Sequence, residues 1–235
     1  MQHASTRRAS AIVAAALIAS AGLPTAAADD KILLGGGAAI VLNDNALCTL
    51  TAVGHDTAGQ LVGFTAAHCG GTGSSVVVEG AEDHGTVGTV VAADEGLDYA
   101  VIELDPDRVR PIADYEGFGI YGLSPADLSP ADPEPAGPDP GVVPEVQHAC
   151  KLGRGTGLNC FDIGPAGVHS TGDEWWQPGD DGAPVTVDDL LVGMVRNGSV
   201  PGAPLTQQGS GIVLFQAILD DVNAKGGPGS GFTLG

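Results

Sequence analysis

Basic residues are scarce in this chain. Nine Lys and Arg residues stand against 29 Asp and Glu residues, which gives a formal net charge of −20. A field of this sign repels nucleic acid and anionic membrane surfaces, whereas it favours solubility and cationic partners. The composition therefore excludes nucleic-acid binding and indicates an acidic, well-solvated surface.

Long hydrophobic runs are also missing, except for one short run near the N-terminus. Residues 9–23 are apolar, Arg7 and Arg8 precede them, and three alanines follow at residues 26–28. This pattern is typical of an export signal peptide, and the run is too short to span a bilayer as a helix. We therefore predict that residues 1–28 are cleaved from a secreted protein that does not stay on the membrane. An uncleaved anchor is the alternative, and the paired arginines leave the export route open.

Cysteine is limited to four residues, which fall as two close pairs. Cys48 is near Cys69, and Cys150 is near Cys160. In an oxidising compartment four cysteines allow three disulfide connectivities, of which the local one is favoured here. A zinc site is the alternative, although neither pair has CxxC spacing. We expect two disulfides and no metal.

Short runs rich in β-branched residues recur between turn signals, and 37 glycines supply the turns. Their spacing predicts an all-β sandwich or barrel rather than alternating strands and helices. The runs are residues 48–53, 61–65, 75–78, 86–92 and 99–104 in the first half, and 146–152, 158–163, 183–187, 190–195 and 211–214 in the second. One C-terminal helix is expected, because apolar residues recur at helical spacing before two glycines. These apolar residues are Phe215, Ile218, Leu219 and Val222.

A proline-rich acidic segment separates the two halves. Residues 124–144 carry seven prolines, which fix φ and remove backbone donors and so exclude a central strand. We predict an extended linker, whose carboxylates leave calcium binding open although no EF-hand spacing is present. The expected domains are a first barrel over residues 29–123, this linker, a second barrel with the helix over residues 145–225, and a flexible tail over residues 226–235.

Two motifs resemble those of the trypsin-like serine peptidases. Residues 65–69, Thr-Ala-Ala-His-Cys, are similar to the segment that carries the catalytic histidine, here His68. Residues 179–185, Gly-Asp-Asp-Gly-Ala-Pro-Val, are similar to the Gly-Asp-Ser-Gly-Gly/Ala-Pro segment that carries the nucleophile. Asp98 opens an apolar run, where an unpaired carboxylate is costly. The resemblance implies that Asp98 holds Nδ1 of His68, and that the chain forms two six-stranded antiparallel β-barrels.

The second half resembles the bacterial branch of that family, which includes the streptogrisins and alpha-lytic protease. Residues 150–160 are similar to its Cys-x-x-Gly-Arg-Thr-Thr-Gly-x-x-Cys hairpin. The resemblance implies a disulfide that closes this hairpin and an ion pair of Arg154 with Asp180. It also implies an oxyanion hole formed at Gly179 and Asp181.

Three departures from the family pattern bear on function. Asp181 replaces the nucleophilic serine, and Arg196 replaces a serine of the substrate-binding strand. Trp175 and Trp176 stand where walls of the primary specificity pocket are expected. A carboxylate that attacks a peptide carbonyl forms a mixed anhydride, and it has no proton for His68 to remove and return to the leaving amine. The acyl-enzyme route is therefore closed at this site.

The sequence thus predicts a secreted, catalytically impaired peptidase homologue. We expect a monomer without a cofactor that binds a peptide or protein ligand. One oxygen of Asp181 should lie near Nε2 of His68 and the other near the N–H of Gly179, while an inward-facing Arg196 would offset their charge. Two alternatives stay open: weak hydrolysis of a peptide or ester through a water held by His68, and an acidic module that binds metal or a cationic partner.

Overall fold

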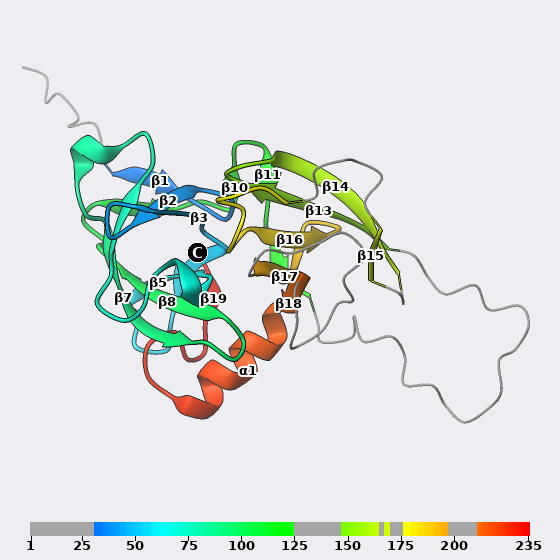
Figure 1. Cartoon of the computed structure of the whole chain (residues 1–235). Coiled ribbons are helices and arrows are strands. Elements are labelled where there is room, and N and C mark those ends of the chain that lie inside the picture. The colour runs from blue at the N-terminus through cyan, green and yellow to red at the C-terminus, as the bar shows by residue number, and fades with distance from the viewer. Residues whose placement is uncertain (1–30, 125–146, 165–166, 170–175, 197–210) are drawn as a thin grey trace, which may run out of the picture. The chain divides into compact units, whose positions relative to one another are not determined.

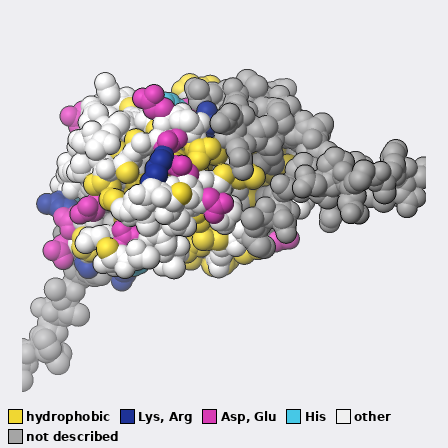
Figure 2. Space-filling model, turned by 90° about the horizontal axis from the view of Figure 1, so that it is seen from below, with side chains coloured by type: hydrophobic (Ala, Val, Ile, Leu, Met, Phe, Trp, Pro, Cys, Tyr) yellow, Lys and Arg dark blue, Asp and Glu magenta, His cyan; other side chains and the backbone are white. Residues whose placement is uncertain are grey.

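The computed structural model describes residues 31–124, 147–164, 167–169, 176–196 and 211–235 (Figure 1). The expected signal peptide and nearly all of the expected linker lie outside these residues, so both stay predictions. Within the described part of the chain, no helix is both long enough and apolar enough to cross a membrane. On the face seen in Figure 2, acidic side chains are spread among hydrophobic ones, and basic side chains are few.

Seven strands of the first half of the chain and the C-terminal strand β19 form a curved, eight-stranded antiparallel sheet in the order β19-β4-β5-β8-β7-β6-β2-β3. Residues of β6 alternate between half-buried and buried, as expected of a barrel wall with one solvated face, whereas every residue of the central strand β5 is buried. The strands are β2 (Ala39–Leu42), β3 (Ala46–Thr49), β4 (Ala52–His55), β5 (Leu61–Thr65), β6 (Ser75–Val78), β7 (Gly88–Asp94), β8 (Tyr99–Leu104) and β19 (Thr233–Leu234).

The second half forms a seven-stranded sheet in the order β12-β17-β16-β13-β14-β15, with β18 paired to β17. Its strand pairs are antiparallel except for β12 with β17. The strands are β12 (Gly122–Leu123), β13 (Gln147–Gly153), β14 (Gly157–Gly164), β15 (Gly167–His169), β16 (Pro184–Val187), β17 (Leu190–Arg196) and β18 (Gly211–Leu214). Figure 1 shows the two sheets as separate curved units, so the all-β prediction is confirmed.

Short elements complete the described structure. Strand β1 (Ile32–Leu34) pairs in parallel with β9 (Val109–Pro111), and β10 (Asp114–Tyr115) pairs with β11 (Phe118–Gly119). Two 3-10 turns span Ala67–Cys69 and Glu82–His84.

The expected C-terminal helix is α1 (Phe215–Lys225), which packs against β17 and β18. Phe215 also lies edge-to-face against Phe64 of β5, with 5.2 Å between ring centroids. Burying a large apolar side chain stabilises a fold by roughly 1.5–3 kcal/mol relative to leaving it exposed. The helix therefore joins the second half of the chain to the core of the first. Its buried residues are those that the sequence predicted: Phe215, Ile218, Leu219 and Val222.

Two predicted boundaries are wrong. Residues 226–235 do not form a free tail, because β19 pairs with β4 and Phe232 is buried against Phe64. Glycines with positive φ at positions 226, 227, 229 and 231 turn the chain back towards the first sheet. Strand β12, expected in the first barrel, pairs instead with β17 of the second sheet. The chain thus crosses between the sheets near residue 122 and returns after α1.

Both predicted disulfides are confirmed. Cys48 bonds Cys69, and Cys150 bonds Cys160, with Cα–Cα distances of 6.3 and 4.0 Å. The first joins β3 to the turn that carries His68, and the second joins paired positions of β13 and β14. Each disulfide therefore braces a segment next to the candidate site.

Candidate active site

His68 lies on the 3-10 turn that follows β5, and Asp98 directly precedes β8. The disulfide of Cys69 fixes this turn to β3, and the N–H of Ala67 donates to the carbonyl of Asp98 at 3.1 Å. Asp98 has φ of 56°, a left-handed conformation that aspartate tolerates better than most residues. The backbone thus brings the two predicted residues together from adjacent strands.

The carboxylate of Asp98 holds His68 through both its ring and its backbone. Nδ1 lies 2.9 Å from Oδ2 and 3.0 Å from Oδ1, and the backbone N–H of His68 donates to Oδ1 at 3.0 Å. Asp98 is only 5% exposed. A carboxylate at Nδ1 fixes the orientation of the ring and favours its protonated form, which leaves Nε2 to act on the opposite side.

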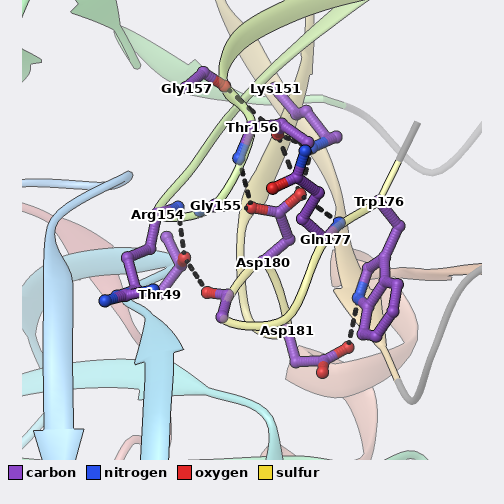
Figure 3. A network of polar contacts seen from close by, with 11 residues as sticks. Thr49, Lys151, Arg154, Gly155, Thr156, Gly157, Trp176, Gln177, Asp180 and Asp181 are labelled. Atoms are coloured by element: carbon purple, nitrogen blue, oxygen red, sulfur yellow. Dashed lines mark hydrogen bonds and ion pairs between the residues drawn. The ribbon is translucent and has the colours of Figure 1, made fainter. Parts of the chain in front are cut away.

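Asp181 occupies that opposite side. Its Oδ2 lies 3.2 Å from Nε2 of His68, as the sequence predicted, and the residue is buried. The other oxygen was expected near the N–H of Gly179. Instead, the indole Nε1 of Trp176 donates to Oδ1 at 3.1 Å (Figure 3), because the chain at Trp176 passes alongside the loop. Two carboxylates therefore flank one imidazole.

The two carboxylates change the protonation of the ring. The hydrogen bonds to Asp181 and then to Asp98 outweigh the opposing effect of burial and raise the pKa of His68 to about 10. The ring is therefore an imidazolium at neutral pH. In this state it carries a proton to donate and has no lone pair with which to accept one.

Hydrogen bonds from β3 and the following residues hold the loop that carries Asp181. The Thr49 hydroxyl donates to the carbonyl of Gly179 at 2.7 Å, and the Thr49 N–H donates to the carbonyl of Asp181 at 2.9 Å. The Thr51 hydroxyl donates to the carbonyl of Gly182 at 2.6 Å. Gly182 has φ of 88°, and a Cβ there would lie 2.2 Å from the carbonyl oxygen of Thr49. This glycine lets the loop approach the first barrel closely, whereas the oxyanion-hole role of Gly179 and Asp181 stays a prediction.

The predicted ion pair of Arg154 with Asp180 is wrong. Asp180 pairs with the fully buried Lys151, with 2.9 Å between Nζ and Oδ2 (Figure 3). Arg154 instead makes two hydrogen bonds of 2.7 Å to Glu79 of the first barrel. The reason is strand register: the side chain of Lys151 faces inward on β13, whereas Arg154 lies in the turn after it.

The Asp180 carboxylate is saturated with donors. Besides Lys151, it accepts hydrogen bonds from the backbone of Gly155, Thr156 and Gln177 and from the hydroxyl of Thr156. Burial raises the pKa of Asp180, but the charge and hydrogen bond of Lys151 and the Thr156 hydrogen bonds outweigh it, so the pKa lies below its usual value. Asp180 is therefore ionised and fixes the start of the loop.

Lys151 and Trp176 are the site residues whose roles the sequence reasoning missed. A period of two places Lys151 on the same face of β13 as the buried Ala149. A buried lysine requires a carboxylate, so this alternation was an available signal. For Trp176 the sequence marked a pocket wall, and nothing in it indicated a hydrogen bond to Asp181.

Arg196 reaches the first barrel. Its Nη1 donates to the carbonyl of Gly96 at 3.3 Å, in the turn between β7 and β8 that also carries Asp98. The residue is buried. The other expected pocket residue, Trp175, lies outside the described residues.

One group of metal-ligating residue types gathers in the described structure, at His148, Cys150 and Cys160. Both sulfurs of this group are joined in a disulfide. They are therefore not thiolates that could bind zinc.

The described structure has the two-barrel fold of the chymotrypsin-like proteases, with a C-terminal helix. Thermobifida fusca Protease A is similar at 19% identity with a TM-score of 0.57, over 87% of this chain and 100% of that one. The Nocardiopsis protease NAPase is similar at 19% identity with a TM-score of 0.52, over 72% of this chain and 87% of that one. The alpha-lytic protease homolog N4 is similar at 18% identity with a TM-score of 0.51, over 83% of this chain and 97% of that one. No protein-family model and no curated protein matches the sequence. Likeness at this identity establishes the fold alone, so function is argued from the residues of this chain.

Proposed function

We propose that this protein is a secreted relative of the chymotrypsin-like peptidases that has lost acyl transfer and binds a peptide or protein segment. The loss of acyl transfer is inferred from the ion pair of His68 with Asp181. In this pair Asp181 occupies the position of the nucleophilic serine. Two disulfides support secretion, because such bonds persist in oxidising compartments.

Three physical arguments exclude an acyl-enzyme at this site. Attack of the Asp181 carboxylate on an amide gives an anhydride, which lies uphill from the amide. The carboxylate supplies no proton for the leaving amine. The imidazolium of His68 cannot act as a general base, because both of its ring nitrogens are protonated and each faces a carboxylate.

The binding part of the proposal draws on the charge and the exposure of the chain. The protein carries a net charge of −20, and the side chain of His68 is 39% exposed although its two partners are buried. A surface of this charge attracts cationic ligands. A Lys- or Arg-rich extended segment is therefore the ligand that we propose.

The first test treats the purified protein with a fluorophosphonate probe and, in parallel, with casein. No labelling and no cleavage are expected, with an active serine peptidase as the positive control. Casein cleavage that disappears in a His68→Ala variant would overturn the proposal.

The second test measures binding of a Lys-rich peptide and of the matched peptide with Glu at the same positions, by calorimetry at low and at high salt. We expect binding of the Lys-rich peptide only, weakened by salt as charge screening requires. Equal affinity for both peptides, or for neither, contradicts the binding proposal and leaves the loss of acyl transfer unaffected.

A further inference from the structure

Four residues of metal-ligating types share one face of the β13–β14 hairpin. Because side chains alternate between the two faces of a strand, His148 lies on the same face as Cys150, and Cys160 on the same face as Asp162. The register pairs Cys150 with Cys160 and His148 with Asp162, and directly opposite residues share a face. The ligand atoms of His148, Cys150 and Cys160 all lie within 4.8 Å of one another. The hairpin thus gathers two sulfurs, an imidazole and a carboxylate.

The disulfide between Cys150 and Cys160 is accessible from solvent. Cys160 is exposed and Cys150 is half-buried, whereas Cys48 and Cys69 of the other disulfide are each 4% exposed. In thiol–disulfide exchange a thiolate must reach one of the two sulfurs, so the rate depends on access. An external dithiol should therefore reduce the Cys150–Cys160 bond well before the buried one.

The geometry of the hairpin does not depend on this disulfide. All seven residues of β13 have a partner in β14. Strand β16 pairs with the other edge of β13, and the buried ion pair of Lys151 with Asp180 fixes β13 from its inner face. The register therefore keeps the two sulfurs opposite each other after the bond between them is reduced.

We propose that reduction of the Cys150–Cys160 disulfide converts this face of the hairpin into a zinc site. The reductant is a dithiol, which gives two electrons and two protons to the two sulfurs and becomes a disulfide itself. Zinc then displaces both thiol protons and binds the two thiolates and a ring nitrogen of His148, with water in the fourth position. One dithiol is oxidised, one disulfide is reduced, and two protons are released when the metal binds.

The spacing of the three ligand atoms suits a tetrahedral zinc ion. With Zn–S bonds of about 2.3 Å, two sulfurs of a tetrahedron lie about 3.8 Å apart, and a nitrogen lies about 3.6 Å from each sulfur. The limit of 4.8 Å exceeds these edges by about one ångström, which side-chain rotation can close once the sulfurs are no longer bonded to each other. Two thiolates and an imidazole are ligands that zinc prefers, whereas calcium and magnesium prefer oxygen.

Asp162 orients the imidazole for this role. Its Oδ1 lies 3.0 Å from Nδ1 of His148, and the two side chains are 48% and 70% exposed. A carboxylate at one ring nitrogen fixes the orientation of the ring and makes the other nitrogen a better ligand, a contact typical of zinc-bound histidines. The net charge of −20 also attracts a divalent cation to the surface of the protein.

Selective reduction is the first test. The mature protein is treated with dithiothreitol under native conditions, free thiols are alkylated, and peptide mass spectrometry identifies the alkylated cysteines. We expect alkylation of Cys150 and Cys160, with Cys48 still bonded to Cys69 and with an unchanged circular dichroism spectrum. Equal reduction of both disulfides, or loss of the folded spectrum when the exposed one is reduced, overturns the proposal.

Metal binding to the reduced protein is the second test. After the dithiol is removed under anaerobic conditions, Co²⁺ is added as a spectroscopic substitute for Zn²⁺. We expect one equivalent to bind, with an absorption band from thiolate-to-cobalt charge transfer that disappears when Zn²⁺ displaces the cobalt. The oxidised protein is the reference and should show no such band. A reduced protein without the band contradicts the site.

Two variants show whether the hairpin face or the thiolates alone hold the ion. His148→Ala and Asp162→Asn should each weaken zinc binding by about 10-fold or more, measured by competition with a chromophoric chelator. His55→Ala, at the exposed end of β4, is the matched control and should leave the affinity unchanged. Equal zinc affinity in His148→Ala and in the control overturns the proposal. These measurements involve neither His68 nor Asp181, so their outcome is independent of the proposed peptide binding.

Discussion

At the scale of single residues, the charge of His68 depends on Asp181. Replacing Asp181 by Asn removes the largest cause of the raised imidazole pKa and leaves Asp98 in place. We expect the pKa of His68, measured by NMR titration of the ring, to fall from about 10 towards its ordinary value of 6.5 in this variant. A ring that titrates near 6.5 already in the parent protein contradicts the ion pair.

The raised pKa of His68 also makes the free energy of unfolding depend on pH. The pKa of His68 in the folded protein is higher than in the unfolded chain, so folding binds the proton more tightly. The resulting stabilisation is complete below about pH 6.5 and is lost as the pH rises towards 10. The difference in melting temperature between the parent and Asp181→Asn should shrink over this range.

Lys151 and Arg154 provide a matched comparison of a buried and a partly exposed ion pair. Lys151→Met leaves the Asp180 carboxylate buried without its cation and should cost about 3–5 kcal/mol of unfolding free energy. Arg154→Met breaks a pair whose side chains are 27% and 33% exposed, and should cost about 0–1 kcal/mol. Urea unfolding of both variants measures the difference. A larger loss of stability in Arg154→Met than in Lys151→Met would mean that Arg154, and not Lys151, is the partner of Asp180.

At the scale of elements, the return of the chain after α1 is a structural part of the first barrel. Phe232, just before β19, packs edge-to-face on Phe64 at 5.1 Å. Phe232→Ala should cost about 3–5 kcal/mol, as removal of a buried aromatic ring does. Leu158→Ala, at a side chain that is 59% exposed, is the control and should change stability by less than about 0.5 kcal/mol. Equal melting of both variants would mean that the packing of Phe232 on Phe64 adds nothing to the stability of the fold.

The sequence predicted those elements whose signals are local. The strand runs, the helix spacing, the two cysteine pairs and the motif around His68 each lie within a short segment. The packing of residues 226–235 was missed, because four turn-forming glycines precede the two large apolar residues of this segment, Phe232 and Leu234. The partner of Asp180 was missed for a different reason. A motif names residue types, but the register of β13 decides which side chain points inward.

At the scale of the whole molecule, both barrels contribute to the site. His68 and Asp98 come from the first barrel and Asp181 from the second, while Thr49, Arg196 and the Glu79–Arg154 pair join the two. Such contacts are set by tertiary packing, and no local pattern in the sequence encodes them. The hydrogen bond from Trp176 to Oδ1 of Asp181 could therefore be seen only in the structure.

Restoring one hydroxyl should therefore not restore a peptidase. Asp181→Ser supplies a nucleophile and relieves His68 of one carboxylate, but it also removes the acceptor of the Trp176 indole and leaves Arg196 bonded to the carbonyl of Gly96. We expect at most slow ester hydrolysis, followed with a chromogenic ester, and no casein cleavage. Adding Arg196→Ser tests whether that side chain limits the rate, and rapid casein cleavage by the single variant would show that position 181 alone blocks the reaction.

The hydrogen bond from Trp176 to Asp181 also makes the site visible in solution. The chain contains two tryptophans, at neighbouring positions 175 and 176, so every indole that emits light lies within a few residues of position 181. An indole whose N–H donates to an anion senses that anion directly. Tryptophan fluorescence is thus an intrinsic reporter of the carboxylate, and it follows protonation of Asp181 or ligand contact there without any added label.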